Sequence, residues 1–372
     1  MNIGIIGCGK LGICYAICFA KVGFKVYCYD INTNILDNIK NNNYNYYEIN
    51  LNNYINNYKN NLILCYEPTE VINNCSIIFT FIQTPSLENG SYNHSYIDKF
   101  INFYCDYSPK DEKIILINST IMPEYSNTIQ EKLKKTLCNT KIIYNPSFIA
   151  QGSIINNIIN PDFILLGYDN YNDQNDLTLD KIINIYNKII ENPKVIYNKM
   201  MLFEAEITKL SINCYITSKI TYANIIGDLL KTKGYNPSVV LNAIGNDSRI
   251  GNKCLNYGFG YGGPCLPRDN KALYNYSFNN NIEIDNCIIN DENNKKHLEF
   301  QFNELKNNKE PIEFNYITYK DNSDILEESQ KLKLAIKLAN NNNKVIINER
   351  PFIIKQLKET YGELFIYNSI EN

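Results

Sequence analysis

Short apolar runs alternate with segments of helical periodicity over about the first 150 residues of the chain. The runs with strand character stand at residues 2–6, 25–29, 62–66, 76–82, 113–118 and 141–144. Strands that alternate with helical patterns are typical of βαβ units and a parallel sheet. We therefore predict a doubly wound Rossmann domain at the N-terminus.

A long apolar stripe at helical spacing follows, from residue 202 to about residue 231, with no proline inside it. A helix of this length spans about 45 Å, so we expect it to connect two domains and to offer a face to a partner subunit. A glycine-rich loop comes next, at 258–263, and the polar, Asn-rich stretch at 279–309 looks like a linker or a weakly ordered insertion.

A second βαβ-like pattern occupies the last part of the chain. Its elements are predicted strands at 313–318, 344–348 and 363–367 and helices near 327–339 and 352–359. These are too few elements for a full doubly wound sheet. The predicted fold class is therefore α/β, and its three parts are a Rossmann domain at 1–200, a central helical region with the glycine-rich loop at 201–278, and a shortened C-terminal Rossmann-like α/β domain at 279–372.

The composition fits a globular protein, with 44% hydrophobic and 20% charged residues. A net charge of −3 leaves no basic excess for displacing counterions from phosphates, so nucleic acid is not expected as a partner. No apolar run reaches the length of about 18 residues that a membrane helix needs, and no targeting segment opens the chain, so no membrane association is expected either.

The 12 cysteines contain no C-x-x-C pair, and several lie in apolar periodic segments where free thiols pack as small hydrophobes. We expect reduced thiols and a cytoplasmic protein, without a metal site. The chain has 2 histidines, His94 and His297, and both stand in polar stretches that we interpret as solvated loops. A chemistry that depends on a histidine base is therefore disfavoured.

The sequence Gly-Cys-Gly-Lys-Leu-Gly at residues 7–12 follows the first predicted strand and opens a helix, and Asp30 ends the second strand. Glycines at this spacing let the backbone approach a pyrophosphate at the helix N-terminus, and the carboxylate accepts hydrogen bonds from ribose hydroxyls. Because Asp30 would also repel a 2′-phosphate, the motif predicts NAD rather than NADP. The predicted cofactor contacts in this motif are Gly7, Gly9, Lys10, Leu11, Gly12 and Asp30.

Thr84-Pro85 and Ser119-Thr120 come directly after the fourth and the fifth predicted strand. Open α/β sheets bind ligands at the carboxyl ends of their strands, so Thr84, Pro85 and Thr120 are further candidates for cofactor contacts. Taken one pair at a time, ordinary turns explain these residues equally well. Their order along the chain favours binding.

Two further candidates stand on the long predicted helix. Lys209 and Asn213 are at positions i and i+4, so both project from one face. A lysine on a helix is usually only a solvated charge, whereas an amide inside an apolar run needs partners that substrate or water could supply.

The segment 258–269 contains several candidate functional residues close together. Pro267 suits the first turn of a helix, which places Cys265 just before a helix N-terminus and Asp269 within the first turn. The helix dipole favours a thiolate there, so Cys265 is a candidate covalent nucleophile and Asp269 a possible base. For every other cysteine we keep the interpretation of a buried structural thiol.

Together these residues resemble the UDP-glucose/GDP-mannose dehydrogenase family of nucleotide-sugar dehydrogenases. The matches run in order along nearly the whole chain: residues 7–12, Thr84-Pro85, Ser119-Thr120, Asn145-Pro146, Asn160-Pro161-Asp162, Glu206 with Lys209 and Asn213, residues 247–251, residues 262–269 and Lys320. So many ordered matches are specific to the family.

The resemblance implies oxidation of the C6 alcohol of a nucleotide sugar, most simply UDP-glucose, to a carboxylate with two NAD. Cys265 would capture the aldehyde as a thiohemiacetal, a second hydride transfer would give a thioester, and water would release the acid. Asp269 would manage protons, with Thr120 and Asn213 holding a water. The ammonium of Lys209 would stabilise developing oxyanions.

The resemblance also implies how substrate binds and how the chain assembles. The glycine loop would cradle the sugar nucleotide, Arg249 would reach the substrate of the neighbouring subunit, and the long helix would build a homodimer. The implied substrate contacts are Lys209, Asn213, Arg249, Tyr257, Gly258, Gly260, Gly262 and Lys320. By the same resemblance the region 1–200 binds NAD, 201–278 carries the catalytic cysteine and the dimer helix, and 279–372 binds the nucleotide.

This chain departs from the family pattern at three places. The family has Asn-Pro-Glu-Phe-Leu-x-Glu-Gly after the sixth strand, and here Ser147 and Gln151 replace the two glutamates. A glutamate there assists thioester hydrolysis in the family, so we expect slow release of the acid. The motif that begins at Lys320 lacks the family's second Asp and its Arg, and the shortened terminal domain leaves an incomplete wall for uracil.

Several functions therefore remain compatible with the sequence. GDP-mannose and a UDP-N-acetylhexosamine are alternative substrates, because residues 84–86 and 266–267 do not separate them from UDP-glucose. A second class is a hydrolysis-impaired relative that binds NAD and nucleotide sugar as a sensing or scaffold subunit, which the loss of both glutamates motivates. A hydroxyacid dehydrogenase of related architecture has no use for Cys265 and is disfavoured.

Overall fold

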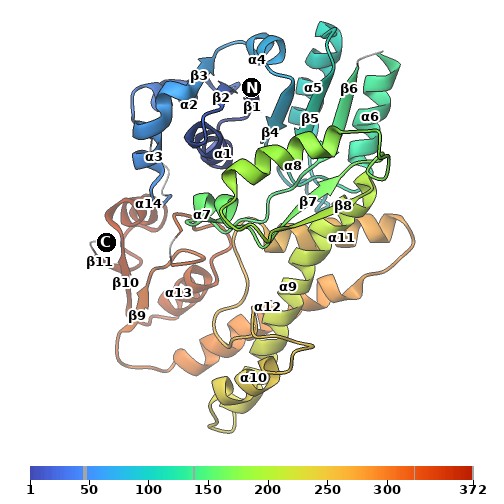
Figure 1. Ribbon diagram of the computed structural model, residues 1–372. Coiled ribbons are helices and arrows are strands. Elements are labelled where there is room, and N and C mark those ends of the chain that lie inside the picture. The colour runs from blue at the N-terminus through green and yellow to red at the C-terminus, as the bar shows by residue number, and fades with distance from the viewer. Residues whose placement is uncertain (45–47, 137–138, 322, 371–372) are drawn as a thin grey trace. The chain divides into compact units, whose positions relative to one another are not determined.

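The computed structural model describes residues 1–44, 48–136, 139–321 and 323–370 (Figure 1). The chain divides into two compact units, Met1–Lys209 and Leu210–Asn372. Among the described residues, no helix combines the length and the apolar character that crossing a membrane requires.

The first unit contains an eight-stranded sheet in the order β3-β2-β1-β4-β5-β6-β7-β8. Its strands are β1 (Asn2–Ile6), β2 (Lys25–Tyr29), β3 (Leu62–Cys65), β4 (Ile77–Thr80), β5 (Lys113–Ile117), β6 (Thr140–Tyr144), β7 (Phe163–Gly167) and β8 (Ile196–Met200). Every neighbouring pair is parallel except β6 and β7. The predicted doubly wound domain is confirmed, and its strand order reverses between β1 and β4, where such sheets bind dinucleotides.

Helices cover both faces of this sheet. The helices of the first unit are α1 (Lys10–Lys21), α2 (Thr33–Lys40), α3 (Leu51–Tyr58), α4 (Pro68–Asn74), α5 (Ser95–Tyr107), α6 (Tyr125–Lys135), α7 (Ile154–Ile159) and α8 (Thr178–Ile189), with a short 3₁₀ turn, η1 (Lys59–Asn61). One apolar core joins the sheet to α1, α2, α3, α7 and α8, and a second joins its other face to α4, α5 and α6. Two parallel-sheet faces buried under helices explain the near-continuous apolar strands.

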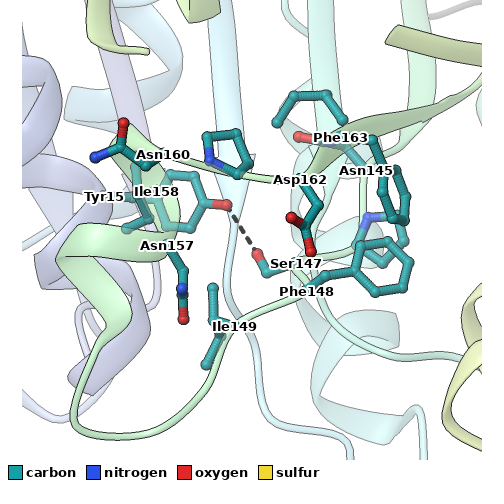
Figure 2. A pocket seen from close by; sticks show the side chains of 13 residues that line it. Tyr15, Asn145, Ser147, Phe148, Ile149, Asn157, Ile158, Asn160, Asp162 and Phe163 are labelled. Carbon is teal, nitrogen blue, oxygen red and sulfur yellow. Dashed lines mark hydrogen bonds between the residues drawn. The ribbon is translucent and has the colours of Figure 1, made fainter. Parts of the chain in front are cut away.

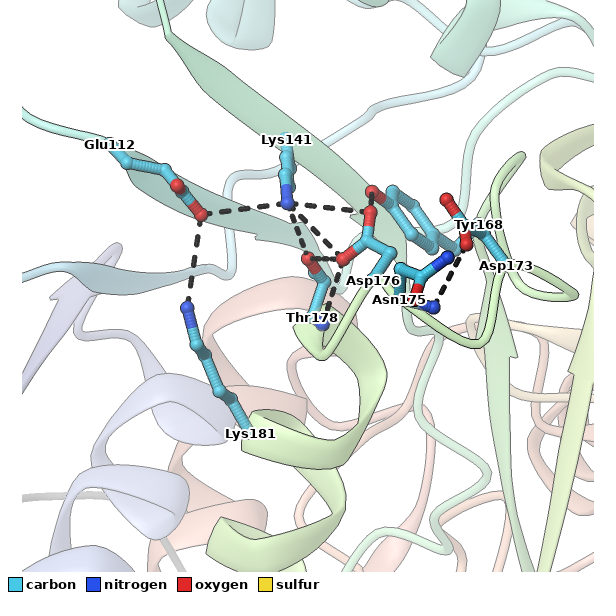
Figure 3. A network of polar contacts seen from close by, with 8 residues as sticks. All are labelled: Glu112, Lys141, Tyr168, Asp173, Asn175, Asp176, Thr178 and Lys181. Atoms are coloured by element: carbon cyan, nitrogen blue, oxygen red, sulfur yellow. Dashed lines mark hydrogen bonds and ion pairs between the residues drawn. The ribbon is translucent and has the colours of Figure 1, made fainter.

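A polar network fixes the chain between β7 and α8 (Figure 3). Asp176 accepts a hydrogen bond from the backbone N–H of Thr178 at 2.9 Å, at the start of α8. The Nζ of Lys141, on β6, lies 3.2 Å from the Asp176 carboxylate and 3.6 Å from Glu112. This ammonium therefore ties α8 to β6, the strand whose carboxyl end leads into residues 145–147.

The second unit combines helices with a small parallel sheet in the order β11-β10-β9. Helix α9 (Leu202–Lys231) begins in the first unit and continues into the second, and it has the length that the apolar stripe predicts. The other elements are α10 (Pro237–Gly245), α11 (Leu266–Asn279), α12 (Asp285–Leu305), β9 (Ile312–Asn315), α13 (Gln330–Asn340), β10 (Val345–Glu349), α14 (Pro351–Tyr361) and β11 (Ile366–Ser369). The predicted βαβ-like terminal unit is thus present, with three strands in one sheet.

The prediction of a linker at 279–309 is wrong, because α12 occupies most of this stretch. One side of α12 is polar and buried, with Asn290, Asn294 and His297 no more than 9% exposed. Its apolar side chains near the C-terminal end pack on the core of the small sheet. A helix whose buried face carries amides does not show the apolar periodicity from which helices are predicted.

The interpretation of both histidines as solvated is also wrong. His297 is 2% exposed. His94 does lie in a loop, just before α5, but its ring stacks on Tyr125 with centroids 3.7 Å apart, and its Nε2 accepts from the backbone N–H of Met122 at 3.1 Å. Burial lowers the pKa of His94 to about 4, so this ring is neutral at pH 7.

Candidate active site

The glycine motif forms the turn between β1 and α1. A Cβ at Gly12 would stand 1.9 Å from the carbonyl oxygen of Gly7, so only glycine fits this close approach. A Cβ at Gly9 would meet no protein atom within 4 Å, which leaves open space directly before the helix. The first turn of α1, which begins with Lys10 and Leu11, carries no acidic residue. This arrangement suits a pyrophosphate held at a helix N-terminus.

Asp30 follows β2 and is 8% exposed. Its carboxylate accepts hydrogen bonds from the backbone N–H groups of Cys8, at 2.7 Å, and Asn32, at 2.9 Å. A carboxylate has about four acceptor positions, so it can also accept from ribose hydroxyls. The bond to Cys8 ties Asp30 directly to the glycine motif, and the residues present therefore fit a dinucleotide.

The loops after β4 and β5 meet at the carboxyl end of the sheet. The hydroxyl of Thr84, which is 6% exposed, donates to the carbonyl oxygen of Thr120 at 2.7 Å. The backbone of Pro85, next in the chain, accepts from the N–H of Asn93 at 2.8 Å. The structure therefore brings together two of the predicted cofactor contacts that lie 36 residues apart.

Lys209 is 7% exposed, so it is not the solvated charge that a lysine on a helix usually is. Its Nζ donates to the backbone carbonyl of Ser147 at 2.9 Å and lies 4.5 Å from the ring centroid of Phe148. The contact with Phe148 is a cation–π interaction, which strengthens when the cation is desolvated. A buried ammonium held next to the loop that follows β6 can stabilise negative charge there.

The loop after β6 lines a small cavity of about 130 Å³ (Figure 2). In this cavity the hydroxyl of Ser147 hydrogen-bonds the phenol of Tyr15 at 3.0 Å, and burial raises the pKa of Tyr15 to about 12. Gln151, in the same loop, has a buried Oε1 with no hydrogen-bond partner among the described residues. Ser147 and Gln151, which replace the two glutamates of the family, therefore provide no proton acceptor near neutral pH.

Glu206 is a buried carboxylate to which the sequence assigns no role. It is 0% exposed and accepts from the backbone N–H groups of Glu124, at 2.6 Å, and Ser126, at 2.9 Å, at the start of α6. Burial raises its pKa to about 7, against the hydrogen bonds to Ser126 and Glu124, which favour the charged form. It is already part of the sequence motif with Lys209 and Asn213, but only its burial shows how it is held.

We expect Glu206 to make folding depend on pH. Its folded pKa lies above the unfolded value of about 4.3, so its contribution is fully present below pH 4 and is lost as the pH rises through 7. The free energy of unfolding should therefore fall by up to about 4 kcal/mol from this group across that window. A Glu206→Gln variant cannot titrate and should show a flatter profile in urea unfolding between pH 4.5 and 8. Equal slopes for the two proteins would refute this role.

Cys265 is exposed and is the N-cap residue of α11, with Pro267 in the first turn, as predicted. Asp269 is 2% exposed, and its carboxylate accepts from the Nδ2 of Asn213 at 2.6 Å. Asn213 lies one turn after Lys209 on α9. The second unit therefore places a thiol at a helix N-terminus and a buried, oriented carboxylate in the first turn of the same helix.

The glycine loop is held by side chains of α9. The N–H of Gly258 donates to the Oδ1 of Asn224 at 3.1 Å, and the hydroxyl of Tyr257 donates to Asp228 at 2.9 Å. A Cβ at Gly260 would stand 2.1 Å from the Oδ1 of Asn294, so the loop approaches α12 closely at this point. Asn224 and Asp228, which hold the loop, lie on a part of α9 outside the sequence motifs.

Three predicted substrate residues remain: Arg249, Lys320 and Gly262. The side chain of Arg249 is 86% exposed and pairs with Asp247 at 2.6 Å. Lys320 is exposed in the loop after β9, where its carbonyl oxygen accepts from the hydroxyl of Thr318 at 2.9 Å. Gly262 is half-buried in the glycine loop.

A Rossmann sheet with a glycine motif and an aspartate just after the second strand is typical of dinucleotide-binding proteins, and comparison with known proteins gives the family. Residues 1–190 match the NAD binding domain of the UDP-glucose/GDP-mannose dehydrogenase family, and residues 203–295 match its central domain. The chain belongs to this family, and its cofactor is NAD.

A curated relative agrees with this family, and solved structures share the fold. The chain is 28% identical over 284 residues to UDP-glucose 6-dehydrogenase AglM of Haloferax volcanii. The matched region covers 73% of this chain and 64% of the relative. Its fold matches a UDP-glucose dehydrogenase of Pyrobaculum islandicum with a TM-score of 0.87 at 21% identity, covering 100% of this chain and 86% of that one. It also matches a UDP-D-ManNAc dehydrogenase of Pyrococcus horikoshii with a TM-score of 0.77 at 21% identity, covering 94% and 83%.

Gly9 and Gly12, in the turn between β1 and α1, should respond differently to replacement by alanine. A Gly9→Ala methyl would fill space that no protein atom occupies, so we expect NAD affinity to fall by about tenfold or more with the melting temperature unchanged. A Gly12→Ala methyl would meet the carbonyl of Gly7 and should lower the melting temperature as well. Calorimetric titration with NAD and thermal unfolding separate the two effects, and undiminished NAD binding by Gly9→Ala would exclude the pyrophosphate from this position.

Proposed function

We propose that this protein oxidises the C6 alcohol of a nucleotide sugar to a carboxylate, with UDP-glucose as the favoured substrate. The observation that carries the proposal is Cys265, an exposed thiol at the N-terminus of α11 with Asp269 one turn away. A nicotinamide dehydrogenase that stops at the aldehyde has no need of such a nucleophile. The name of the Haloferax relative supports UDP-glucose, while that of the Pyrococcus structure keeps a UDP-N-acetylhexosamine open, and GDP-mannose remains an alternative within the family.

The chemistry divides between the cofactor and the cysteine. When bound, NAD supplies the hydride acceptor for both oxidations, so two are consumed for each sugar. The Sγ of Cys265 bonds to the aldehyde carbon and the thiol proton passes to the aldehyde oxygen, which gives a thiohemiacetal. The thiohemiacetal carbon then loses a hydride and its hydroxyl loses a proton to solvent, which leaves a thioester on Cys265. The oxygen of a water then bonds to the carbonyl carbon, the C–S bond breaks, and the thiol is restored with the acid released.

The polar residues would serve the proton transfers and the developing charges. Asp269, oriented by its hydrogen bond from Asn213, would accept the proton of the alcohol. The buried ammonium of Lys209 would stabilise oxyanions, because a charge in a desolvated position acts more strongly than one in water. Thr120 would hold a water for the proton transfers.

The glycine loop and Lys320 would bind the nucleotide sugar. Tyr257, Gly258, Gly260 and Gly262 would cradle it with their backbone, and Lys320 would add a positive charge. Arg249 projects from the surface and would serve the substrate of a neighbouring copy rather than its own.

We propose a homodimer built on α9. Tyr215, Tyr222 and Leu229 stand seven residues apart on this helix and are 66%, 50% and 59% exposed, and Ile225 between them is 43% exposed. Apolar side chains at seven-residue spacing are typical of a seam between two helices. Light scattering should therefore give twice the mass of one chain, and a Tyr222→Glu change in the seam should shift the protein toward monomer. A wild-type monomer at micromolar concentration would contradict the dimer.

The second candidate function is a binding subunit that does not complete the reaction. The observation in its favour is the pair Ser147 and Gln151, because a hydroxyl bonded to a neutral phenol and an amide cannot take a proton from water. Such a protein would bind NAD and nucleotide sugar without releasing acid.

One experiment separates these functions. The purified protein and NAD are incubated with UDP-glucose, GDP-mannose, UDP-N-acetylglucosamine and UDP-N-acetylmannosamine, while NADH and the intact mass of the protein are followed. We expect two NADH for each molecule of UDP-glucose, with a substrate-sized adduct on Cys265 during turnover. Binding of sugar without NADH would support the binding subunit, and no binding of any of the four would refute the proposed substrate class.

A further inference from the structure

The buried polar face of α12 contacts the backbone of the glycine loop. The Nδ2 of Asn294 donates to the carbonyl of Tyr261 at 2.9 Å, and its Oδ1 accepts from the N–H of the same residue at 3.0 Å. One turn further along α12, His297 lies 2.7 Å from the carbonyl oxygen of Gly258, and Gln301 donates to that oxygen at 3.2 Å. The spacing of four, three and four residues from Asn290 through Asn294 and His297 to Gln301 keeps these side chains on one face. The loop is therefore held by α12 as well as by α9, although the sequence marks α12 only as polar.

His297 sits between two acceptors. Its Nδ1 lies 2.9 Å from both carboxylate oxygens of Asp228 on α9, and its Nε2 lies 2.7 Å from the carbonyl oxygen of Gly258. A neutral imidazole carries one N–H and one lone pair, so it could satisfy only one of these oxygens. Both contacts are short and the ring is 2% exposed, so only a ring that donates from both nitrogens would satisfy the two oxygens together.

The groups around the ring support this protonation. Asp228 supplies the negative charge from α9, and it also accepts from the hydroxyl of Tyr257 in the loop. Burial, with the bond to Asp228, raises the pKa of Tyr257 well above its usual range, so this phenol remains a donor. Glu304, from the same helix as His297, adds negative charge near Tyr257. Asp228 from α9 and Glu304 from α12 therefore bring two carboxylates to this cluster.

We propose that His297 is a positioning residue of the substrate loop, whose doubly protonated ring ties the Gly258 carbonyl to Asp228 and fixes the loop backbone for the nucleotide sugar. The proposal rests on the proposed function insofar as that function assigns this loop to the substrate. His297 lies beyond residues 203–295, the part that matches the family's central domain. With a neutral ring, one of the two oxygens would face a lone pair, and the loop would lose one of its ties to α9.

The first test uses the unmodified protein with ¹⁵N-labelled histidine. The chain has 2 histidines, and His94 is a neutral acceptor at pH 7, so the ring-nitrogen spectrum should contain one neutral and one doubly protonated imidazole. Two neutral rings at pH 7 would overturn the proposal. This measurement requires neither substrate nor a variant.

The second test compares His297→Gln with Lys296→Gln, a control at the neighbouring exposed position of the same helix. A glutamine can donate to one of the two oxygens but not to both. We expect faster hydrogen exchange at the amides of Gly258 and Tyr261, a KM for the nucleotide sugar raised about tenfold, and kcat and NAD affinity within about twofold of wild type. The control should match wild type in all four measurements.

Exchange at the wild-type rate in His297→Gln would overturn the positioning role. If the proposed function is wrong, the protein should produce no NADH from any nucleotide sugar. The hydrogen-exchange and ring-nitrogen measurements do not depend on turnover and would still test the role of His297. A variant that gives faster exchange together with an unchanged KM for the sugar would also refute the proposal, because the loop would then move without consequence for binding.

Discussion

A Cys265→Ser variant is expected to lose steady-state acid formation by about a thousandfold or more. A serine hydroxyl at this position has a far higher pKa than a thiol, and the N-terminus of α11 cannot make it an alkoxide near neutral pH. The second oxidation needs the covalent adduct, so the reaction should stop at the aldehyde. NADH production with UDP-glucose, followed together with the intact protein mass, should show a trace of first-step NADH and no adduct.

Cys254→Ser is the matched control for this variant. Among the described cysteines, Cys254 and Cys265 are the two exposed ones, so both are open to reagents and substrate. Cys138 lies outside the described residues, and the other nine are buried. We expect Cys254→Ser to turn over at the wild-type rate with its adduct intact. Normal turnover by Cys265→Ser would show that the covalent mechanism is wrong.

The N-terminal sheet was predictable because its strands are buried on both faces. β1 and β5 are nearly continuous apolar runs, and such runs separated by helical patterns admit few interpretations. β7 and β8 were missed for reasons that lie in the sheet. β8 is an edge strand with only half-buried and exposed positions, and β7 meets β6 antiparallel through a single residue pair, outside the βαβ pattern.

The turn residues of the candidate site were predictable for a related reason. In a parallel sheet the carboxyl ends of the strands share one edge, so Thr84 and Thr120 had to lie near each other once β4 and β5 were assigned. Pro267 likewise fixed the start of α11, and with it the place of Cys265. The roles of these residues in binding and catalysis stay predictions.

Burial is what the sequence could not supply. The sequence does not reveal whether Lys209 and His297 are solvated or buried. The structure shows that each is less than 10% exposed. Once a charged side chain is enclosed, its partners decide its chemistry. For Lys209 the partner is the carbonyl of Ser147, and for His297 the partners come from α9 and the glycine loop.

A Gln151→Glu variant is expected to raise the steady-state release of acid by about a hundredfold, the usual range for a general base. Glutamate has nearly the shape of glutamine, and the Oε1 of Gln151 is already buried without a hydrogen-bond partner among the described residues, so the change should leave the loop in place. Partial burial would raise the pKa of the new carboxyl toward neutrality, where it can take a proton from water.

The measurement is the thioester on Cys265 during turnover with UDP-glucose. In the wild-type protein the acyl-enzyme should accumulate, because oxidation is complete while hydrolysis lacks a base, and in Gln151→Glu it should fall below detection by intact mass. Gln151→Asn, which keeps an amide, is the control and should accumulate the acyl-enzyme like wild type. Fast acid release by the wild-type protein with no thioester present would mean that another group activates the water. The buried carboxylate of Asp269 would then be the first to replace, since it already lies in the first turn of the helix that carries the thiol.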